Sequence, residues 1–206
     1  MNSDFCLSRL TFVTVASMLL SGCLPKPSTI STRHFVLAPV STNVPTAGAG
    51  ESLTVGIGFV KMPSYLLRNS IAIRKGPTEI EYLDDAQWGE RLDQSFRRTV
   101  AADLSALLPS ATIYLTDWSL EQVALTASVT VEQFDVDTSG HGILNAQWRI
   151  TPSAKGLSSR DGNARLARTG TPPRGNPEVI AATLSELTSE FSRELAQAIR
   201  NSATTH

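Results

Sequence analysis

In Gln122-Val123-Ala124-Leu125-Thr126-Ala127-Ser128-Val129-Thr130-Val131-Glu132-Gln133-Phe134-Asp135-Val136, a regular alternation of side chains predicts a long strand, on which the predicted fold is built. Apolar side chains occupy every second position over residues 123–131, and the pattern then shifts by one residue to Phe134 and Val136. A strand places alternate side chains on opposite faces of a sheet. A shift within one run therefore predicts a bulge or sharp bend near Glu132-Gln133.

The residues that follow predict a hairpin. Residues 135–140 are turn-forming, and a second alternating run follows, with an inward face of Leu144, Ala146, Trp148 and Ile150. The same turn resembles the opening of a calcium loop, whose oxygen ligands alternate and whose sixth residue is glycine. The twelfth position of such a loop requires a bidentate Glu, and here it is Ala146. We therefore expect a turn and no metal site.

Upstream, residues 53–60 predict another strand. Leu53, Val55, Ile57 and Phe59 would share one face, and Gly56 and Gly58 lie on the other. Glycine weakens a strand unless another group must come close, so these glycines predict tight packing above the sheet. A phosphate-binding glycine loop would need a third glycine that opens a helix, and this sequence lacks it.

Shorter runs complete the predicted strands. Residues 70–74 and 78–83 form a predicted hairpin across Lys75-Gly76-Pro77. Three further short strands are expected at residues 34–37, 112–115 and 164–168.

Two segments have the period of an amphipathic helix. The first has its apolar stripe on Trp88, Leu92, Phe96, Val100, Leu104 and Leu107 or Leu108, and Pro109 ends it. The second begins at Asn176, with Pro177 in its first turn, and its stripe is Ile180, Leu184, Leu187, Phe191, Leu195 and Ile199. Strands and helices in this order predict an α/β fold, a single-domain sandwich with a mixed β-sheet and two main amphipathic helices.

The polar face of the first helix leaves two alternatives open. It carries acidic and basic residues together, which is typical of a solvated surface. The other interpretation is that Arg91, Arg97 and Arg98 contact a partner or lipid headgroups.

The N-terminus predicts lipidation at Cys23. A mostly apolar run, residues 10–20, follows Arg9 and is too short to span a bilayer, as in a signal peptide. Ser21 and Gly22 are small residues before a cysteine, where a lipoprotein signal peptidase would cleave after acylation, for example with palmitate. Several acyl chains anchor a protein far better than one. Leu24, rather than Asp, follows the cysteine and favours the outer membrane, on its periplasmic face.

Three regions are expected: a removed signal peptide (1–22), a lipidated tether rich in Pro, Ser and Thr (23–33), and a periplasmic domain (34–202). Cleavage would remove one acidic and one basic residue, so the net charge of −1 would not change, and a near-neutral chain argues against nucleic acid. It would also remove Cys6, which leaves no free thiol. With 41% hydrophobic and 18% charged residues, the composition is that of an ordinary globular domain.

The chain resembles the ABC-type transport auxiliary lipoproteins over nearly all of its mature length. The resemblance rests on the order of five pieces: residues 34–37, residues 55–58 with 60–66, Tyr82 with Ala86-Gln87-Trp88, Phe134-Asp135, and residues 144–148. It implies an outer-membrane lipoprotein that supports membrane integrity and docks an MCE-domain membrane protein. That partner would span the periplasm and move phospholipids or similar lipophilic molecules between membranes. A ring-like homo-oligomer would suit such a dock.

The candidate partner or lipid contacts are Tyr65, Leu66 and Trp88. The first two follow a proline within the apolar segment Met62-Pro63-Ser64-Tyr65-Leu66-Leu67, expected to be a loop. The alternative is that these side chains cover the core.

An enzyme and a structural lipoprotein are the competing classes of protein. His34, His141 and His206 lack the spacing of a metal site or a catalytic triad, and the carboxylates at Glu79, Glu81, Asp84, Asp85, Asp135 and Asp137 lie at strand edges or turns. We therefore expect no enzymatic activity, cofactor or metal. A structural lipoprotein that binds peptidoglycan or another envelope complex remains the alternative.

Overall fold

The computed structural model describes residues 31–39 and 53–203. The predicted signal peptide and Cys23 lie outside these residues. The elements are β1 (Arg33–Phe35), β2 (Leu53–Lys61), the 3-10 helix η1 (Ser64–Leu67), β3 (Ser70–Arg74), β4 (Ile80–Trp88), α2 (Leu92–Leu107), β5 (Ala111–Tyr114), β6 (Leu125–Val136), β7 (His141–Pro152), β8 (Arg160–Thr169) and α3 (Pro177–Ala203). Within the described ranges, no helix has the length and apolarity needed to cross a membrane.

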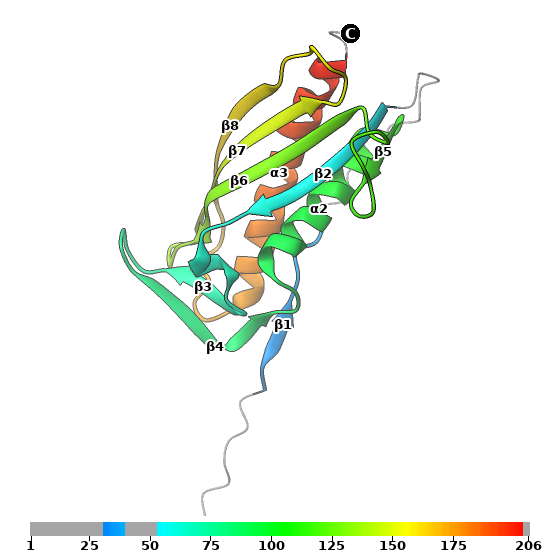
Figure 1. Cartoon of the computed structure of the whole chain (residues 1–206). Coiled ribbons are helices and arrows are strands. Elements are labelled where there is room, and N and C mark those ends of the chain that lie inside the picture. Colours follow the sequence, from blue (N-terminus) through cyan, green and yellow to red (C-terminus); the bar gives the residue numbers. More distant parts are fainter. Residues whose placement is uncertain (1–30, 40–52, 204–206) are drawn as a thin grey trace, which may run out of the picture. The chain divides into compact units, whose positions relative to one another are not determined.

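The largest element is a five-stranded mixed sheet in the order β5-β2-β6-β7-β8 (Figure 1). β6 and β7 form the predicted hairpin, in which Leu125 pairs with Pro152 and Val136 with Gly142. The register shifts between Val131 and Gln133, so the predicted bulge is confirmed. It moves Phe134 and Val136 onto the face that the preceding apolar residues occupy, and both are fully buried.

The strand β2 departs from its predicted pattern at Phe59. Its pairing with β6, which is parallel, shifts between Ile57 and Val60. A bulge of this kind changes the direction of the side chains that follow it. Val60 is therefore buried and Phe59 is 86% exposed, so the expectation that Phe59 shares the inward face was wrong.

A second, three-stranded sheet has the order β1-β4-β3. The predicted hairpin of β3 and β4 is confirmed, with Arg74 opposite Ile80, while β1 runs parallel to β4. The sequence predicts a single mixed sheet, because alternation within a strand does not identify its neighbours. Trp88 was also expected in the first helix but ends β4, and the helix begins at Leu92.

Both helices pack on the same face of the five-stranded sheet. α2 contacts β2 and β5, and α3 contacts β6, β7 and β8, so the helices form a layer behind the sheet in Figure 1. The rings of Phe96, Phe134 and Phe191 join α2, β6 and α3, with ring centroids 5.4 and 5.5 Å from that of Phe96. The Asn176 side chain accepts a hydrogen bond from the Glu178 N–H (3.2 Å), which confirms the predicted cap of α3.

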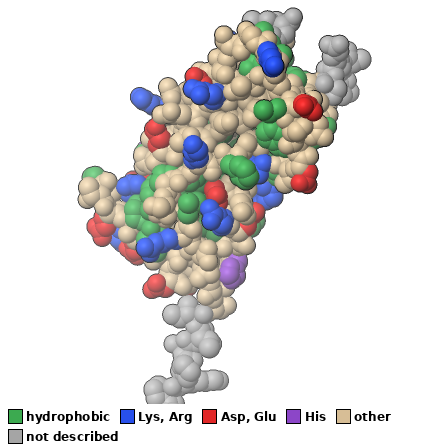
Figure 2. All heavy atoms as spheres, viewed as in Figure 1, with side chains coloured by type: hydrophobic (Ala, Val, Ile, Leu, Met, Phe, Trp, Pro, Cys, Tyr) green, Lys and Arg blue, Asp and Glu red, His purple; other side chains and the backbone are tan. Residues whose placement is uncertain are grey.

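The opposite face of this sheet carries mostly polar side chains. Figure 2 shows Lys, Arg, Asp and Glu on this side, with hydrophobic side chains in small separate patches. The tight packing predicted at Gly56 is confirmed, because a Cβ there would lie 2.8 Å from the Trp118 ring.

Candidate functional site

The candidate contact segment is the loop Met62–Leu67, here called the Tyr65 loop, which connects the two sheets. Its centre is the single turn η1, closed by a hydrogen bond from the Leu66 N–H to the Pro63 carbonyl (3.0 Å). Met62, Tyr65 and Leu67 are partly exposed, whereas Leu66 is buried. The loop therefore presents apolar surface on a turn whose inner side is anchored in the core.

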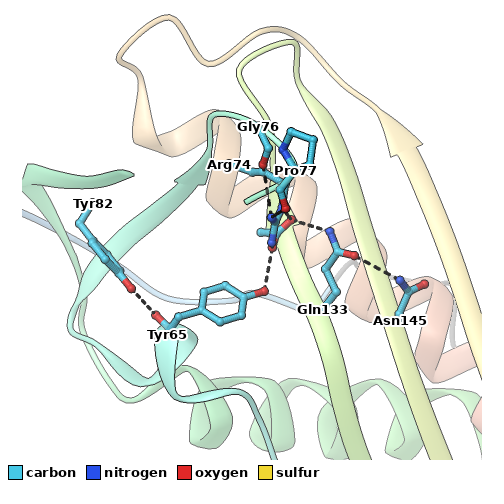
Figure 3. A network of polar contacts seen from close by, with 8 residues as sticks. Tyr65, Arg74, Gly76, Pro77, Tyr82, Gln133 and Asn145 are labelled. Atoms are coloured by element: carbon cyan, nitrogen blue, oxygen red, sulfur yellow. Dashed lines mark hydrogen bonds and ion pairs between the residues drawn. The ribbon is translucent and has the colours of Figure 1, made fainter. Parts of the chain in front are cut away.

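Tyr65 is fixed by a charged network at the junction of the sheets (Figure 3). Its hydroxyl donates a hydrogen bond to Asp135 Oδ2 (2.8 Å) on β6. Arg74, at the end of β3, binds the same carboxylate through both Nε (2.9 Å to Oδ1) and Nη2 (2.6 Å to Oδ2). A bidentate guanidinium pair is among the stronger contacts a protein can form. The network thus joins the Tyr65 loop, the hairpin of β3 and β4, and the large sheet.

Amide side chains complete this network. Gln133 Nε2 donates to Asp135 Oδ1 (3.0 Å), and Asn145 Nδ2 on β7 donates to Gln133 Oε1 (3.3 Å). Burial alone would raise the pKa of Asp135, but the hydrogen bonds from Arg74, Gln133 and Tyr65 hold it below its ordinary value. Burial and the hydrogen bond to Asp135 raise the pKa of Tyr65. Asp135 is therefore a carboxylate and Tyr65 a neutral phenol at neutral pH.

The three candidate contact residues occupy different environments. Leu66 and Trp88 are 4% and 6% exposed and belong to the core. Tyr65 is partly exposed, and its backbone carbonyl accepts a hydrogen bond from the Tyr82 hydroxyl (3.1 Å). Of the three, only Tyr65 offers side-chain surface to a partner, and contact by any of them stays a prediction.

Two arginines of the first helix region have carboxylate partners. Arg91 pairs with Asp93 (3.0 Å), and Arg98 pairs with Glu90 (2.6 Å) and also donates to the Leu37 carbonyl. Arg97 differs, because its guanidinium donates to the backbone carbonyls of Ile57 and Leu115. These contacts bind the start of α2 to the large sheet and to the segment after β1.

The Asp-rich hairpin turn binds itself. Asp137 Oδ1 accepts hydrogen bonds from the Ser139 N–H, the Ser139 hydroxyl and the His141 N–H, at 2.6–2.9 Å. Asp135 binds Arg74 instead, so the carboxylates of Asp135 and Asp137 do not converge on one site. The interpretation as a turn agrees with this geometry, and the described part of the chain holds no cluster of three metal-ligating side chains.

Sequence reasoning missed both the Asp135 network and the exposure of Phe59. The network had a visible signal: a lone acid in the strongly apolar stretch Phe134-Asp135-Val136 must find a cation once that stretch is buried. Arg74, 61 residues upstream, could not be chosen from among the other arginines without the tertiary fold.

Comparison with known proteins agrees with the fold described above. The chain is 25% identical over 138 residues to the intermembrane transport lipoprotein PqiC of Escherichia coli K12, covering 67% of this chain and 72% of that protein. A crystal structure of an uncharacterised protein superposes with a TM-score of 0.65 at 19% identity, covering 82% of this chain and 99% of that one. A protein from Xanthomonas campestris superposes equally well, with a TM-score of 0.65 at 12% identity, covering 84% and 98%.

The family assignment rests on the sequence itself. Residues 35–196 match the family described as the ABC-type transport auxiliary lipoprotein component, and this range runs from the end of β1 into the last turns of α3. The chain therefore belongs to the family of ABC-type transport auxiliary lipoproteins.

Proposed function

We propose that the protein is an outer-membrane lipoprotein that docks a periplasm-spanning MCE-domain protein of an intermembrane lipid transport system, and that it has no enzymatic activity of its own. Acylated Cys23 would hold it on the periplasmic face, and residues 24–33 would act as a tether. The membership of residues 35–196 in a transport auxiliary family is the observation that carries this proposal.

The Tyr65 loop is the surface we assign to the partner. A loop held by hydrogen bonds loses little conformational entropy on binding, which favours affinity. Tyr65 is fixed through both its hydroxyl and its carbonyl, and tyrosine is enriched at the centres of interfaces. Leu66 and Trp88 would support the loop from the core.

Several copies around the end of a tubular partner would present several Tyr65 loops at once, which would raise the avidity of the dock. A homo-oligomer of this kind is part of the proposal. Its direct test is the mass of the purified lipoprotein in detergent.

The experiment is an affinity pull-down of the tagged lipoprotein from detergent-solubilised native membranes, with mass spectrometry of the proteins and lipids recovered. Recovery of an MCE-domain protein, reduced by Tyr65→Ala and retained by the exposed control Ser158→Ala, is expected. Recovery of only peptidoglycan-bound or unrelated envelope proteins would favour a structural lipoprotein instead.

A further inference from the structure

Arg97 is a cation without an anion inside the described chain. Its Nε and Nη2 donate to the Ile57 carbonyl at 3.2 and 2.6 Å, and Nη2 also donates to the Leu115 carbonyl. No described group accepts a hydrogen bond from Nη1. The two backbone carbonyls neutralise none of its charge, since each is only a dipole.

The pKa values of the arginines differ according to whether a carboxylate lies beside them. Hydrogen bonds to Asp93 and Asp161 raise the pKa values of Arg91 and Arg149. Burial, with no compensating carboxylate, lowers the pKa of Arg97. A bound anion would offset this desolvation.

A concavity of about 530 Å³ lies next to this guanidinium, within the range of small-molecule sites. It is lined by the start of α2, the end of β2 and the segment after β5. Two ion pairs also line it, Arg91 with Asp93 and Arg98 with Glu90, and in each pair the acid neutralises the arginine. The charge that remains is that of Arg97, so the concavity is positive.

An apolar ring stands at the rim of the same concavity. The Phe59 centroid lies 5.1 Å from the Arg97 guanidinium carbon, and Phe59 is 86% exposed. The β2 bulge turns this ring outward, and bulges often re-aim side chains at functional sites. Cation and aromatic surface are thus fixed side by side by the fold.

We propose that this concavity, the Arg97 pocket, binds the phosphate of an amphiphile, with the phosphate on Arg97 and the start of its hydrocarbon part against Phe59. A free anion would bind the guanidinium but would have no apolar part to pack on the exposed ring. A purely apolar ligand would leave the guanidinium unpaired. This inference rests on the proposed function and names the ligand class of one site in it. The site is separate from the Tyr65 loop.

The test is native mass spectrometry of the full-length lipoprotein, delipidated in nonionic detergent and incubated with defined probes. Phosphatidylglycerol, diacylglycerol with the same acyl chains, and inorganic phosphate form the probe set. We expect phosphatidylglycerol to be retained at least about tenfold better than diacylglycerol, as for one charge-assisted contact. Equal retention of the two lipids would overturn the proposal.

Variants assign the binding to the pocket. Arg97→Gln should reduce phosphatidylglycerol retention about tenfold, and Phe59→Ser about fivefold. Phe59 is 86% exposed and lies outside the core, so its variant keeps the test valid if Arg97→Gln unfolds. Arg149→Gln removes an exposed charge from a different concavity, one that Phe59 also lines but Arg97 does not, so it is the matched control and should have no effect.

Two further outcomes separate the ligand sources and the two proposals. Binding of inorganic phosphate with no loss in Phe59→Ser would indicate a free-anion site and overturn the amphiphile. Pull-down of the MCE-domain partner should be unchanged by Phe59→Ser, so that a failed lipid assay and a failed docking assay can be distinguished.

Discussion

Arg74 and Arg97 are both partly buried arginines beside the large sheet, yet only Arg74 has its anion within the described chain. Arg74 holds Asp135 in a bidentate pair, and the pair joins the two sheets. Arg97 holds backbone carbonyls and borders an open concavity. A charge that is paired inside the fold therefore serves stability, whereas a charge left unpaired at a surface cavity is available to a ligand.

The largest effect is expected at the paired site. Arg74→Met would leave the Asp135 carboxylate, 2% exposed, without its cation. Removing one partner of a buried ion pair costs about 3–5 kcal/mol of unfolding free energy. Urea denaturation of the variant would measure this loss.

The control for that variant is Arg149→Met. Arg149 forms an ion pair with Asp161 in which both side chains are more than half exposed, and water and salt screen such a pair, so its loss should change the free energy of unfolding little. Equal losses for the two variants would contradict a structural role for the Arg74–Asp135 pair.

A smaller loss is expected from Arg97→Met. This change removes hydrogen bonds to the Ile57 and Leu115 carbonyls but leaves no buried charge behind, so it should cost about 1–3 kcal/mol. The same denaturation assay applies. A loss larger than that of Arg74→Met would contradict the distinction between the two arginines, since Arg97 would then be the more important structural cation.

Tyr65→Phe should cost about 1 kcal/mol, the usual contribution of one hydrogen bond. Asp135 keeps its bonds from Arg74 and Gln133, so its charge stays compensated. Tyr114→Phe is the control. The Tyr114 hydroxyl forms no hydrogen bond with any described residue, so its removal should change stability little. A loss as large as that of Arg74→Met would show that the phenol, not the guanidinium, holds the network.

The smallest effect concerns Asp103 in the interface between α2 and α3. It is 4% exposed, and its Oδ2 accepts no hydrogen bond from any described group. Burial raises its pKa, although the hydroxyls of Ser192 and Ser189 and the charge of Arg193 oppose the rise. Asp103→Asn should therefore change the stability at pH 7 by less than about 1 kcal/mol, and a loss above about 2 kcal/mol would contradict this reading.

The sign of the pH dependence distinguishes the two acids. Because the folded pKa of Asp103 is raised, its contribution to stability falls as the pH rises from 3.8 through that pKa. The folded pKa of Asp135 is lowered, so its contribution is present above pH 3.8 and is lost as the pH falls through the folded pKa. Urea denaturation at pH values from 3 to 7 would give the free energy of unfolding as a function of pH. Compared with the unsubstituted protein, Asp103→Asn should give a flatter curve only above pH 3.8.

Local patterns were sufficient to predict most elements. Period-two alternation identified β6 and its bulge, and helical spacing identified α2 and α3, because these signals are written within one stretch of chain. Trp88 was misplaced because a large apolar residue suits either a helix stripe or a strand end. The division into two sheets depends on which strands pair. No single stretch of sequence contains that information.

The functional surfaces were less predictable than the fold. The Tyr65 loop could be selected as apolar residues after a proline, but its anchoring by Asp135 depends on contacts across 70 residues. Phe59 looked like a core residue until the β2 bulge turned it outward. A bulge without a visible shift in the apolar pattern leaves no trace in sequence.

The most direct test of the docking proposal is photocrosslinking in intact cells from the Tyr65 loop. A photoreactive residue at exposed Ser64 is compared with one at exposed Ser158, between β7 and β8 at the other end of the large sheet. We expect a crosslink from position 64 to an MCE-domain protein and none from position 158. Crosslinks to that protein from position 158 only, or to cell-wall proteins from position 64, would overturn the docking proposal.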